Sequence, residues 1–438
     1  MRCDNLFLWY LGEDAPRYIG ALKPVVSGKG VSLRYGTEWL STGFALSEDL
    51  PLTDTDFFPA GRLESQHPRA VGDVDDARPD RWGEKVIRFI DKPDRLSLME
   101  FLYYAGDDRF GALGVSTSAT EYIPKGRGPL PRLEDAQTLS EVVAKVQEGE
   151  SLTEIESQII AGGGTPLGGA KPKALIVIEA EQWVIKFFNG EPFDSPLVEH
   201  ASMTLAARAG INVAQTKVIP VDGFNAIVIR RFDRKGDKRI HCISAGTAIR
   251  AGTPSGQEPE MGYPELARIL RRAGVSENDV NASDARELFK RMVFNILIDN
   301  TDDHEKNHSL LVVNPGRFAR FRLAPAYDVL PSNSGQGFQE FICGKDLNES
   351  TLANAMTQVE AFGLTQPEAA NLVVEVIAVV NTWREHFAAL GVSELDLESL
   401  AQRIDGDVLK SQRDSFDPTD YPQVRIKSSR KSPFQQRR

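Results

Sequence analysis

The sequence IDNTDDHEKN, residues 298–307, is the stretch from which the fold and chemistry of the whole chain are interpreted. An amphipathic helix is expected before it, at 284–297, and an apolar strand after it opens a short hairpin that leads to Asp328. Asp302, Asn307 and Asp328 thus supply an acid, an amide and a second acid. In phosphoryl transfer one carboxylate accepts the proton of the attacking hydroxyl, while an Asn and an Asp hold Mg²⁺ on the nucleotide phosphates. The pattern favours a kinase with Asp302 as its base.

The same loop allows other interpretations. It suits a polar turn that ends the helix, since Asn and Asp are turn formers. His304 and His308, with Asp302 and Asp303, suggest a metallohydrolase, although zinc ligands four residues apart usually share a helix and this stretch is a loop. His304 also suits a structural residue bonded to backbone near the second acid, and Lys306 suits either a phosphate contact or a solvated lysine. Asp303 should point away from Asp302, so it is not given the role of base.

Lys186 stands among apolar residues in WVIKFF, residues 183–188. Burying its ammonium group without a partner would be costly, so a buried Lys186 needs an anion. The α- and β-phosphates of ATP would serve, with a carboxylate such as Glu199 orienting the lysine. The alternative is a lysine on an edge strand that points to water and blunts the edge.

A glycine-rich segment, AGGGTPLGGAKPK at 161–173, precedes that strand. Its glycines exclude a stable helix or strand, and its backbone N–H groups are able to wrap phosphates. It matches neither GxxxxGK[ST] nor a clean GxGxxG, and many glycine-rich loops are simply flexible. Lys171 and Lys173 beside it favour an anion site.

The composition is that of an ordinary globular protein. The 438 residues carry a net charge of -11, which argues against non-specific coating of nucleic acid. Three distant cysteines predict no disulfide framework and fit a reducing cytoplasm. The start has no signal-peptide pattern, and no run of 18 apolar residues predicts a membrane span.

The patterns along the chain predict an α+β fold in four parts. Residues 1–125 are expected to form a small α+β domain, and 126–235 a lobe that contains the glycine-rich loop and a hairpin of strands 174–178 and 183–188 with its turn at 179–182. Residues 236–414 are expected to form an all-helical lobe that carries the 298–307 loop and includes one long helix at 366–390. A polar, basic tail at 415–438 is expected to be disordered.

Together these motifs resemble the HipA family of serine/threonine kinases, the toxins of HipBA-type toxin–antitoxin modules. The matching pieces in the later part of the chain are GGAKPKAL (168–175), WVIK (183–186), RRFDR (230–234), DDHEKN (302–307) and AYDVL (326–330). The matching pieces in the first part are LPL (50–52), PDRWG (79–83) and GDDRFGAL (106–113).

The resemblance implies a bilobal, protein-kinase-like fold with a mixed β N-lobe, a helical C-lobe and an extra N-terminal domain. It implies Asp302 as catalytic base, Lys186 on the phosphates, and Mg²⁺ held by Asn307 and Asp328. The backbone from Arg230 to Phe232 would be the hinge that holds adenine. The further residues expected at the nucleotide are Gly168, Gly169, Lys173, His304 and Lys306.

The resemblance also implies partners. The family's substrate is a protein, in known members an aminoacyl-tRNA synthetase, and a small helix-turn-helix antitoxin of HipB type binds the toxin and carries any DNA contact. Family toxins are often silenced by autophosphorylation of a serine in the glycine-rich loop, where this chain offers only Thr165. The hinge position often held by Glu is Arg230, so a side-chain contact to adenine from that position would be lost.

Two other functions stay open at this point. A kinase-fold enzyme that phosphorylates a small molecule would share the arrangement of acid, amide and acid, but would leave the N-terminal domain unexplained. A nucleotide-holding co-repressor with little catalysis would bind a DNA-bound partner whether or not Asp302 is intact.

Overall fold

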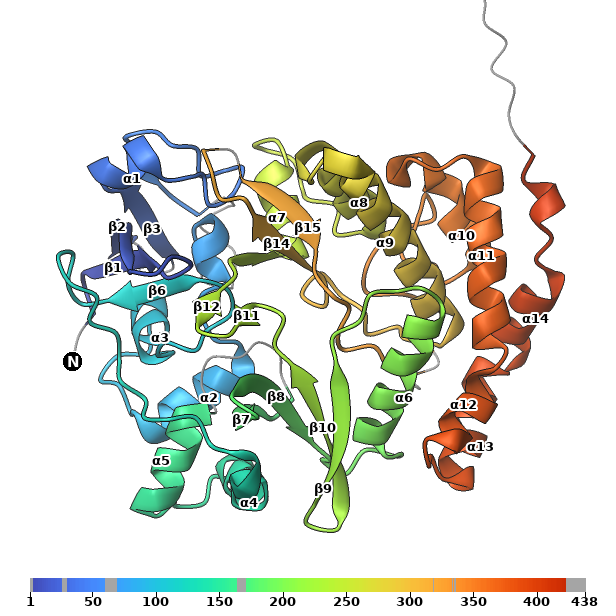
Figure 1. Cartoon of the computed structure of the whole chain (residues 1–438), viewed down its shortest axis with the longest axis horizontal. Helices are drawn as coiled ribbons and strands as arrows, with labels where there is room; N and C mark the ends of the chain where they lie inside the picture. The colour runs from blue at the N-terminus through green and yellow to red at the C-terminus, as the bar shows by residue number, and fades with distance from the viewer. Residues whose placement is uncertain are drawn as a thin grey trace, which may run out of the picture.

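The computed structural model describes residues 3–25, 30–59, 69–163, 171–317, 319–332, 334 and 336–422. It confirms the α+β class and the two lobes with an additional N-terminal domain (Figure 1). No helix in these described parts of the chain is both long and apolar enough to cross a membrane. Of the tail expected to be disordered at 415–438, residues 415–422 are described and include the end of α14 (Asp407–Ser415) and the short helix η5 (Pro418–Asp420), so the expectation is wrong there. Residues 423–438 lie outside the described residues, and the expected boundaries at 125, 235 and 414 stay predictions.

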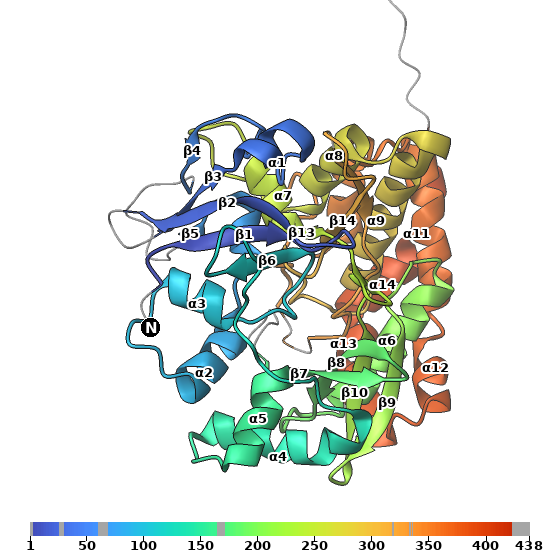
Figure 2. The ribbon, with the colours of Figure 1, turned by 60° about the vertical axis from the view of Figure 1, so that its left-hand side comes forward.

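The N-terminal domain is built on a sheet in the order β4-β3-β2-β1-β6, with β5 parallel to β3. Its strands are β1 (Leu6–Tyr10), β2 (Arg17–Pro24), β3 (Gly30–Tyr35), β4 (Asp56–Phe57), β5 (Arg69–Ala70) and β6 (Leu113–Ser116). Its helices are α1 (Thr37–Thr42), η1 (Gly72–Asp75), α2 (Arg81–Ile90) and α3 (Leu98–Tyr104). Helix α2 lies beside α3 and contacts α4 and α5 of the next part, so it joins the domain to the small lobe (Figure 2).

The small lobe is a four-stranded antiparallel sheet in the order β7-β8-β10-β9. Its strands are β7 (Lys173–Ile178), β8 (Glu181–Phe187), β9 (Thr216–Val221) and β10 (Phe224–Arg230). Helices α4 (Ala136–Glu148) and α5 (Glu154–Gly163) follow the short helix η2 (Leu133–Asp135) in the chain. Val228 of β10 packs in one hydrophobic cluster with residues of α2, α4 and α5. Ile227 and Ile229 pack with α6 (Ser195–Arg208), because alternate residues face opposite sides of a strand.

The turn between β7 and β8 is shorter than the four residues expected at 179–182. Only Glu179 and Ala180 lie between the strands, with φ of 51° and 65°. Two successive residues with positive φ are the geometry of a tight two-residue hairpin, whose twist matches that of the strands. The sequence hides this turn because neither residue is Gly, Asn or Asp.

The large lobe is mainly helical. Its helices are α7 (Ala245–Gly252), α8 (Tyr263–Ala273), η3 (Glu277–Asp279), α9 (Val280–Leu297), α10 (Leu352–Ala355), η4 (Met356–Phe362), α11 (Gln366–Val380), α12 (Trp383–Ala389), α13 (Glu394–Ile404), α14 (Asp407–Ser415) and η5 (Pro418–Asp420). The short hairpin β11 (Arg234–Lys235) and β12 (Lys238–Arg239) leads into it. The expectation of helices alone was wrong, because β13 (Cys242–Ser244) pairs with the predicted hairpin β14 (Ser309–Val313) and β15 (Arg320–Leu323).

Two helix predictions in this lobe also need correction. The helix expected at 366–390 is two helices, because Thr382 leaves helical geometry and its hydroxyl bonds back to the carbonyl of Val379 at 2.8 Å. Helix α9 begins at Val280, four residues before the expected start. Asp284 therefore lies inside the helix, where its carboxylate accepts from the N–H of Leu323 at 2.8 Å.

Asp76 of the N-terminal domain contacts Ser244 of the large lobe, and this contact should make the stability of the protein depend on pH. Its carboxylate accepts from the N–H and hydroxyl of Ser244 at 2.7 and 2.8 Å, and burial, then Asp73, raises its pKa to about 6. The pKa of Asp76 is thus higher in the folded than in the unfolded protein. The contribution of this carboxyl to the unfolding free energy is therefore complete below about pH 4 and is lost as pH rises through 6. The slope is at most about 1.4 kcal/mol per pH unit.

We expect Asp76→Asn to flatten the dependence of the unfolding free energy on pH between 4 and 7. Urea denaturation of both proteins at pH 4.5 and 7.5 measures this difference. Equal losses of stability in the two proteins would contradict the assignment.

Candidate active site

The ammonium group of Lys186 lies between two carboxylates from different parts of the fold. Its Nζ is 2.8 Å from Oε1 of Glu199 on α6 and 2.7 Å from Oδ1 of Asp328, after β15. Burial alone would lower the pKa of Lys186, but Asp328 and Glu199 raise it well above its usual value, so the group stays charged. Because β8 is paired on both sides, the edge-strand interpretation of this lysine is wrong.

The two carboxylates differ in access and charge. The side chain of Asp328 is 32% exposed, whereas that of Glu199 is 4% exposed. Burial would raise the pKa of Asp328, yet Lys186 and Lys173 hold it well below its usual range, while burial raises the pKa of Glu199. Asp328 is thus an ionised, reachable carboxylate of the kind that Mg²⁺ prefers, and Glu199 is the enclosed partner that orients the lysine.

The loop after α9 folds back on itself. Asp302 is exposed, while Asn307 is buried and bonded through its backbone N–H to the carbonyl of His304 at 2.9 Å. The side-chain nitrogen of Asn307 reaches the carbonyl of Asp302 at 3.4 Å, which uses the amide nitrogen rather than the oxygen that a cation needs. The hydroxyl of Tyr327, which directly precedes Asp328, donates to the carbonyl of Lys306 at 2.7 Å. This bond joins the loop to the segment that carries the second acid.

His304 and Lys306 stay close together in this loop. Nδ1 of His304 accepts from the backbone N–H of Lys306 at 3.2 Å, so its backbone partner lies within the loop rather than near Asp328. The ammonium group of Lys306 pairs with Asp80 of the N-terminal domain at 2.5 Å. Lys306 therefore forms an ion pair with another domain instead of extending freely into solvent.

Asp303 points into the protein, as predicted, and away from its exposed neighbour. Its carboxylate is 3% exposed and contacts Nε2 of His308 at 2.9 Å and the hydroxyl of Tyr263. Asn295 donates to the same hydroxyl at 2.9 Å and accepts from Asn300 at 3.1 Å. This buried network fixes the loop to α8 and α9, and it occupies Asp303 and His308, two of the four side chains that the metallohydrolase interpretation would use as ligands.

Lys173 begins β7 and is the cross-strand partner of Lys186. Cross-strand partners share one face of a sheet, so the two ammonium-bearing side chains extend from the same side. Burial, then Lys186, lowers the pKa of Lys173. This concentration of positive charge directly follows the glycine-rich segment and suits phosphate. The expected contacts at Thr165, Gly168 and Gly169 lie outside the described residues.

The expected hinge runs from the end of β10 to Phe232. The backbone N–H of Arg231 donates to the carbonyl of Gln182 at 3.0 Å, which continues the strand pairing into the hinge. The ring of Phe232 lies 5.5 Å from that of Tyr327, so the hinge packs on the segment that carries the second acid. Adenine recognition by the backbone here stays a prediction.

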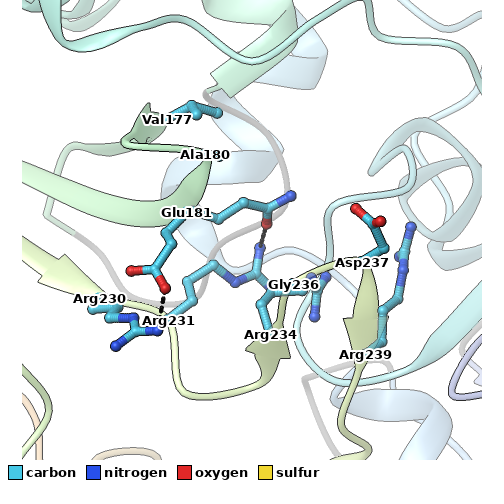
Figure 3. Close-up of a pocket in the computed structure, with 10 residues that line it drawn as sticks. Val177, Ala180, Glu181, Arg230, Arg231, Arg234, Gly236, Asp237 and Arg239 are labelled. Carbon is cyan, nitrogen blue, oxygen red and sulfur yellow. Dashed lines mark hydrogen bonds and ion pairs between the residues drawn. The ribbon is translucent and has the colours of Figure 1, made fainter.

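The side chains of Arg230, Arg231 and Arg234, in and next to the hinge, are engaged by other groups of the protein. Arg230 pairs with Glu181 beside a cavity of about 240 Å³ (Figure 3). Arg231 and Arg234 bind Asp233 at 2.7 and 2.9 Å and donate to carbonyls of the N-terminal domain. The residues lining the cavity are Val177, Ala180, Glu181, Gln182, Arg230, Arg231, Arg234, Gly236, Asp237 and Arg239. Arg231 and Arg234 thus bind the hinge to the N-terminal domain, whereas Arg230 binds within the small lobe.

The fold and this site define a bilobal, kinase-like protein with an additional N-terminal domain. A model of the HipA-like C-terminal domain matches residues 165–383, and a model of the HipA N-terminal domain matches residues 9–116. The chain belongs to the HipA family.

Individual relatives agree with this assignment. The chain is 27% identical to Y4dM of Sinorhizobium fredii over 255 residues, which are 55% of this chain and span only 56% of that relative. It is 22% identical to the serine/threonine-protein kinase toxin HipA of Shewanella oneidensis, over 74% of this chain and 75% of that protein. A solved complex of HipA, HipB and operator DNA from Shewanella oneidensis MR-1 matches with a TM-score of 0.58 at 17% identity, over 94% of this chain and 97% of the other, a likeness of fold.

We expect substitutions of the two adjacent acids of the loop to differ in their effect on stability. Asp303→Ala would leave the Tyr263 hydroxyl and His308 without their buried acceptor and should destabilise the protein by about 2–4 kcal/mol. Asp302→Ala removes an exposed side chain and should change stability by less than about 0.5 kcal/mol. Urea denaturation of the two variants measures the contrast, and similar losses in both would refute the division of roles.

Proposed function

We propose that the chain is an ATP- and Mg²⁺-dependent serine/threonine protein kinase. The observation that carries the proposal is the contact of Lys186 with both Glu199 and Asp328, which joins the two lobes at one charged point. With nucleotide bound, Lys186 would hold the phosphates while Glu199 orients the ammonium group. Lys173, on the same face, would add a second positive charge.

The loop after α9 would carry the chemistry. Asp302, whose side chain is exposed, would accept the proton of the attacking hydroxyl. Asn307 and Asp328 offer the carboxylate and amide oxygens that Mg²⁺ takes, and the ion would neutralise charge on the phosphates. His304 and Lys306 would lie near the transferring phosphate, and the hinge backbone from Arg230 to Phe232 would hold adenine.

We further propose that the kinase is a cytoplasmic toxin whose target is a protein of translation, such as an aminoacyl-tRNA synthetase. Support comes from family membership and from the Shewanella relative named as a kinase toxin. The solved HipA complex contains HipB and operator DNA, which supports a small helix-turn-helix antitoxin as partner, with DNA contacted through that antitoxin. Thr165 is the residue of the glycine-rich segment that would take an autophosphorylation.

Removing the base should abolish transfer without unfolding the protein. Purified protein with Mg²⁺ and γ-labelled ATP should label proteins of a heat-treated bacterial lysate, and Asp302→Asn should reduce the rate by about 10²–10⁴-fold. Asp54→Asn, an exposed acid on the N-terminal domain, is the matched control and should retain full activity. Labelling of small hydroxyl compounds alone, or full activity of Asp302→Asn, would contradict the proposal.

A further inference from the structure

Asp80 of the N-terminal domain reaches the loop that carries Asp302. It stands at the N-cap of α2, yet within the described chain its carboxylate does not cap that helix. The carboxylate instead lies 2.5 Å from Nζ of Lys306, although the two residues are 226 positions apart. Asp80 is 15% exposed and Lys306 is 43% exposed, so the acid is the more enclosed member of the pair.

The position of Asp80 is set by the small lobe. Trp82, two residues further along α2, donates from Nε1 to the carbonyl of Lys173 at 2.8 Å, directly after the glycine-rich segment. Trp82 and Val86 are buried in the cluster that covers one face of the small-lobe sheet. Helix α2 is therefore packed against that lobe (Figure 2), while the carboxylate of Asp80, at its N-cap, contacts Lys306 of the other lobe.

The backbone of Lys306 is set by the large lobe. Its N–H is bonded to His304 and its carbonyl to the hydroxyl of Tyr327. These contacts fix where the side chain begins, but a four-carbon chain still has many rotamers. Asp80 supplies the contact that selects the direction of the ammonium group.

We propose that Asp80 is a positioning residue for phosphoryl transfer, which holds Lys306 in the orientation that meets the transferring phosphate. The inference rests on the proposed kinase function. A lysine already oriented before the nucleotide arrives loses less rotamer freedom in the transition state, and such preorganisation is expressed in rate. Partly exposed ion pairs add little to stability, so the pair's value lies in orientation rather than in holding the domains together.

The test is a double-mutant cycle on the full chain. Initial rates of labelling with Mg²⁺, γ-labelled ATP and heat-treated bacterial lysate give apparent kcat and the KM for ATP. Asp80→Asn should lower kcat about tenfold, with KM for ATP changed less than twofold, and Asp80→Glu should recover part of the loss. Lys306→Met should lower kcat at least as much, and the double variant should be no slower than Lys306→Met alone, because Asp80 acts through that lysine.

Asp75→Asn is the matched control. Asp75 lies in the same domain, its side chain is 13% exposed, and it bonds Arg78 and the N–H of Ala70 rather than the catalytic loop. It should retain the wild-type kcat, and thermal unfolding shows that each variant is folded.

The possible outcomes distinguish a failure of the positioning role of Asp80 from a failure of the proposed kinase function. An active wild type with unchanged kcat in Asp80→Asn overturns the positioning role alone. So does a further loss when Asp80→Asn is added to Lys306→Met, which would mark Asp80 as a tether between lobes. An inactive wild type overturns the kinase function and this role with it.

Discussion

The rest of the structure depends on one charge that is expensive to bury. An ammonium group on the central strand β8 requires carboxylates, and Glu199 and Asp328 supply them from α6 and from the segment after β15. Removing one partner of such a buried pair is costly, because the remaining charge is left uncompensated. The relative placement of the two lobes is therefore tied to this point, since residues of both lobes contact the same ammonium group.

The N-terminal domain strengthens the same arrangement from outside. Arg231 and Arg234 bind Asp233 and both donate to the carbonyl of Arg109, so the hinge is held against the loop at 107–111. Burial would raise the pKa of Asp233, but the two arginines hold it far below its usual range, and the network stays ionised at any physiological pH. A hinge braced in this way has less freedom than a bare connection between lobes, which favours a preformed site.

The parts of the fold that the sequence predicted are those governed by local burial. The apolar stripe of α9, including Leu288, Met292 and Ile296, is fully buried as its spacing of four indicates. What the sequence could not predict depends on contacts with distant residues. Asp284 stands at the expected start of the helix, but its carboxylate bonds β15, and the pairing of β13 with β14 joins segments more than 60 residues apart by chain numbering.

In the site, too, local sequence patterns identify residues whose roles depend on distant contacts. Asp302 and Asp303 show this. Sequence spacing marks both acids, and turn geometry places them on opposite sides, but their roles follow from what each side meets. Asp303 meets Tyr263 and His308 in the interior, whereas Asp302 is exposed to solvent. Asp80 is the converse case: a residue within the quoted PDRWG motif whose partner, Lys306, lies on another domain. A motif identifies residues that matter, and only the folded contacts separate those that act on a substrate from those that hold another side chain in place.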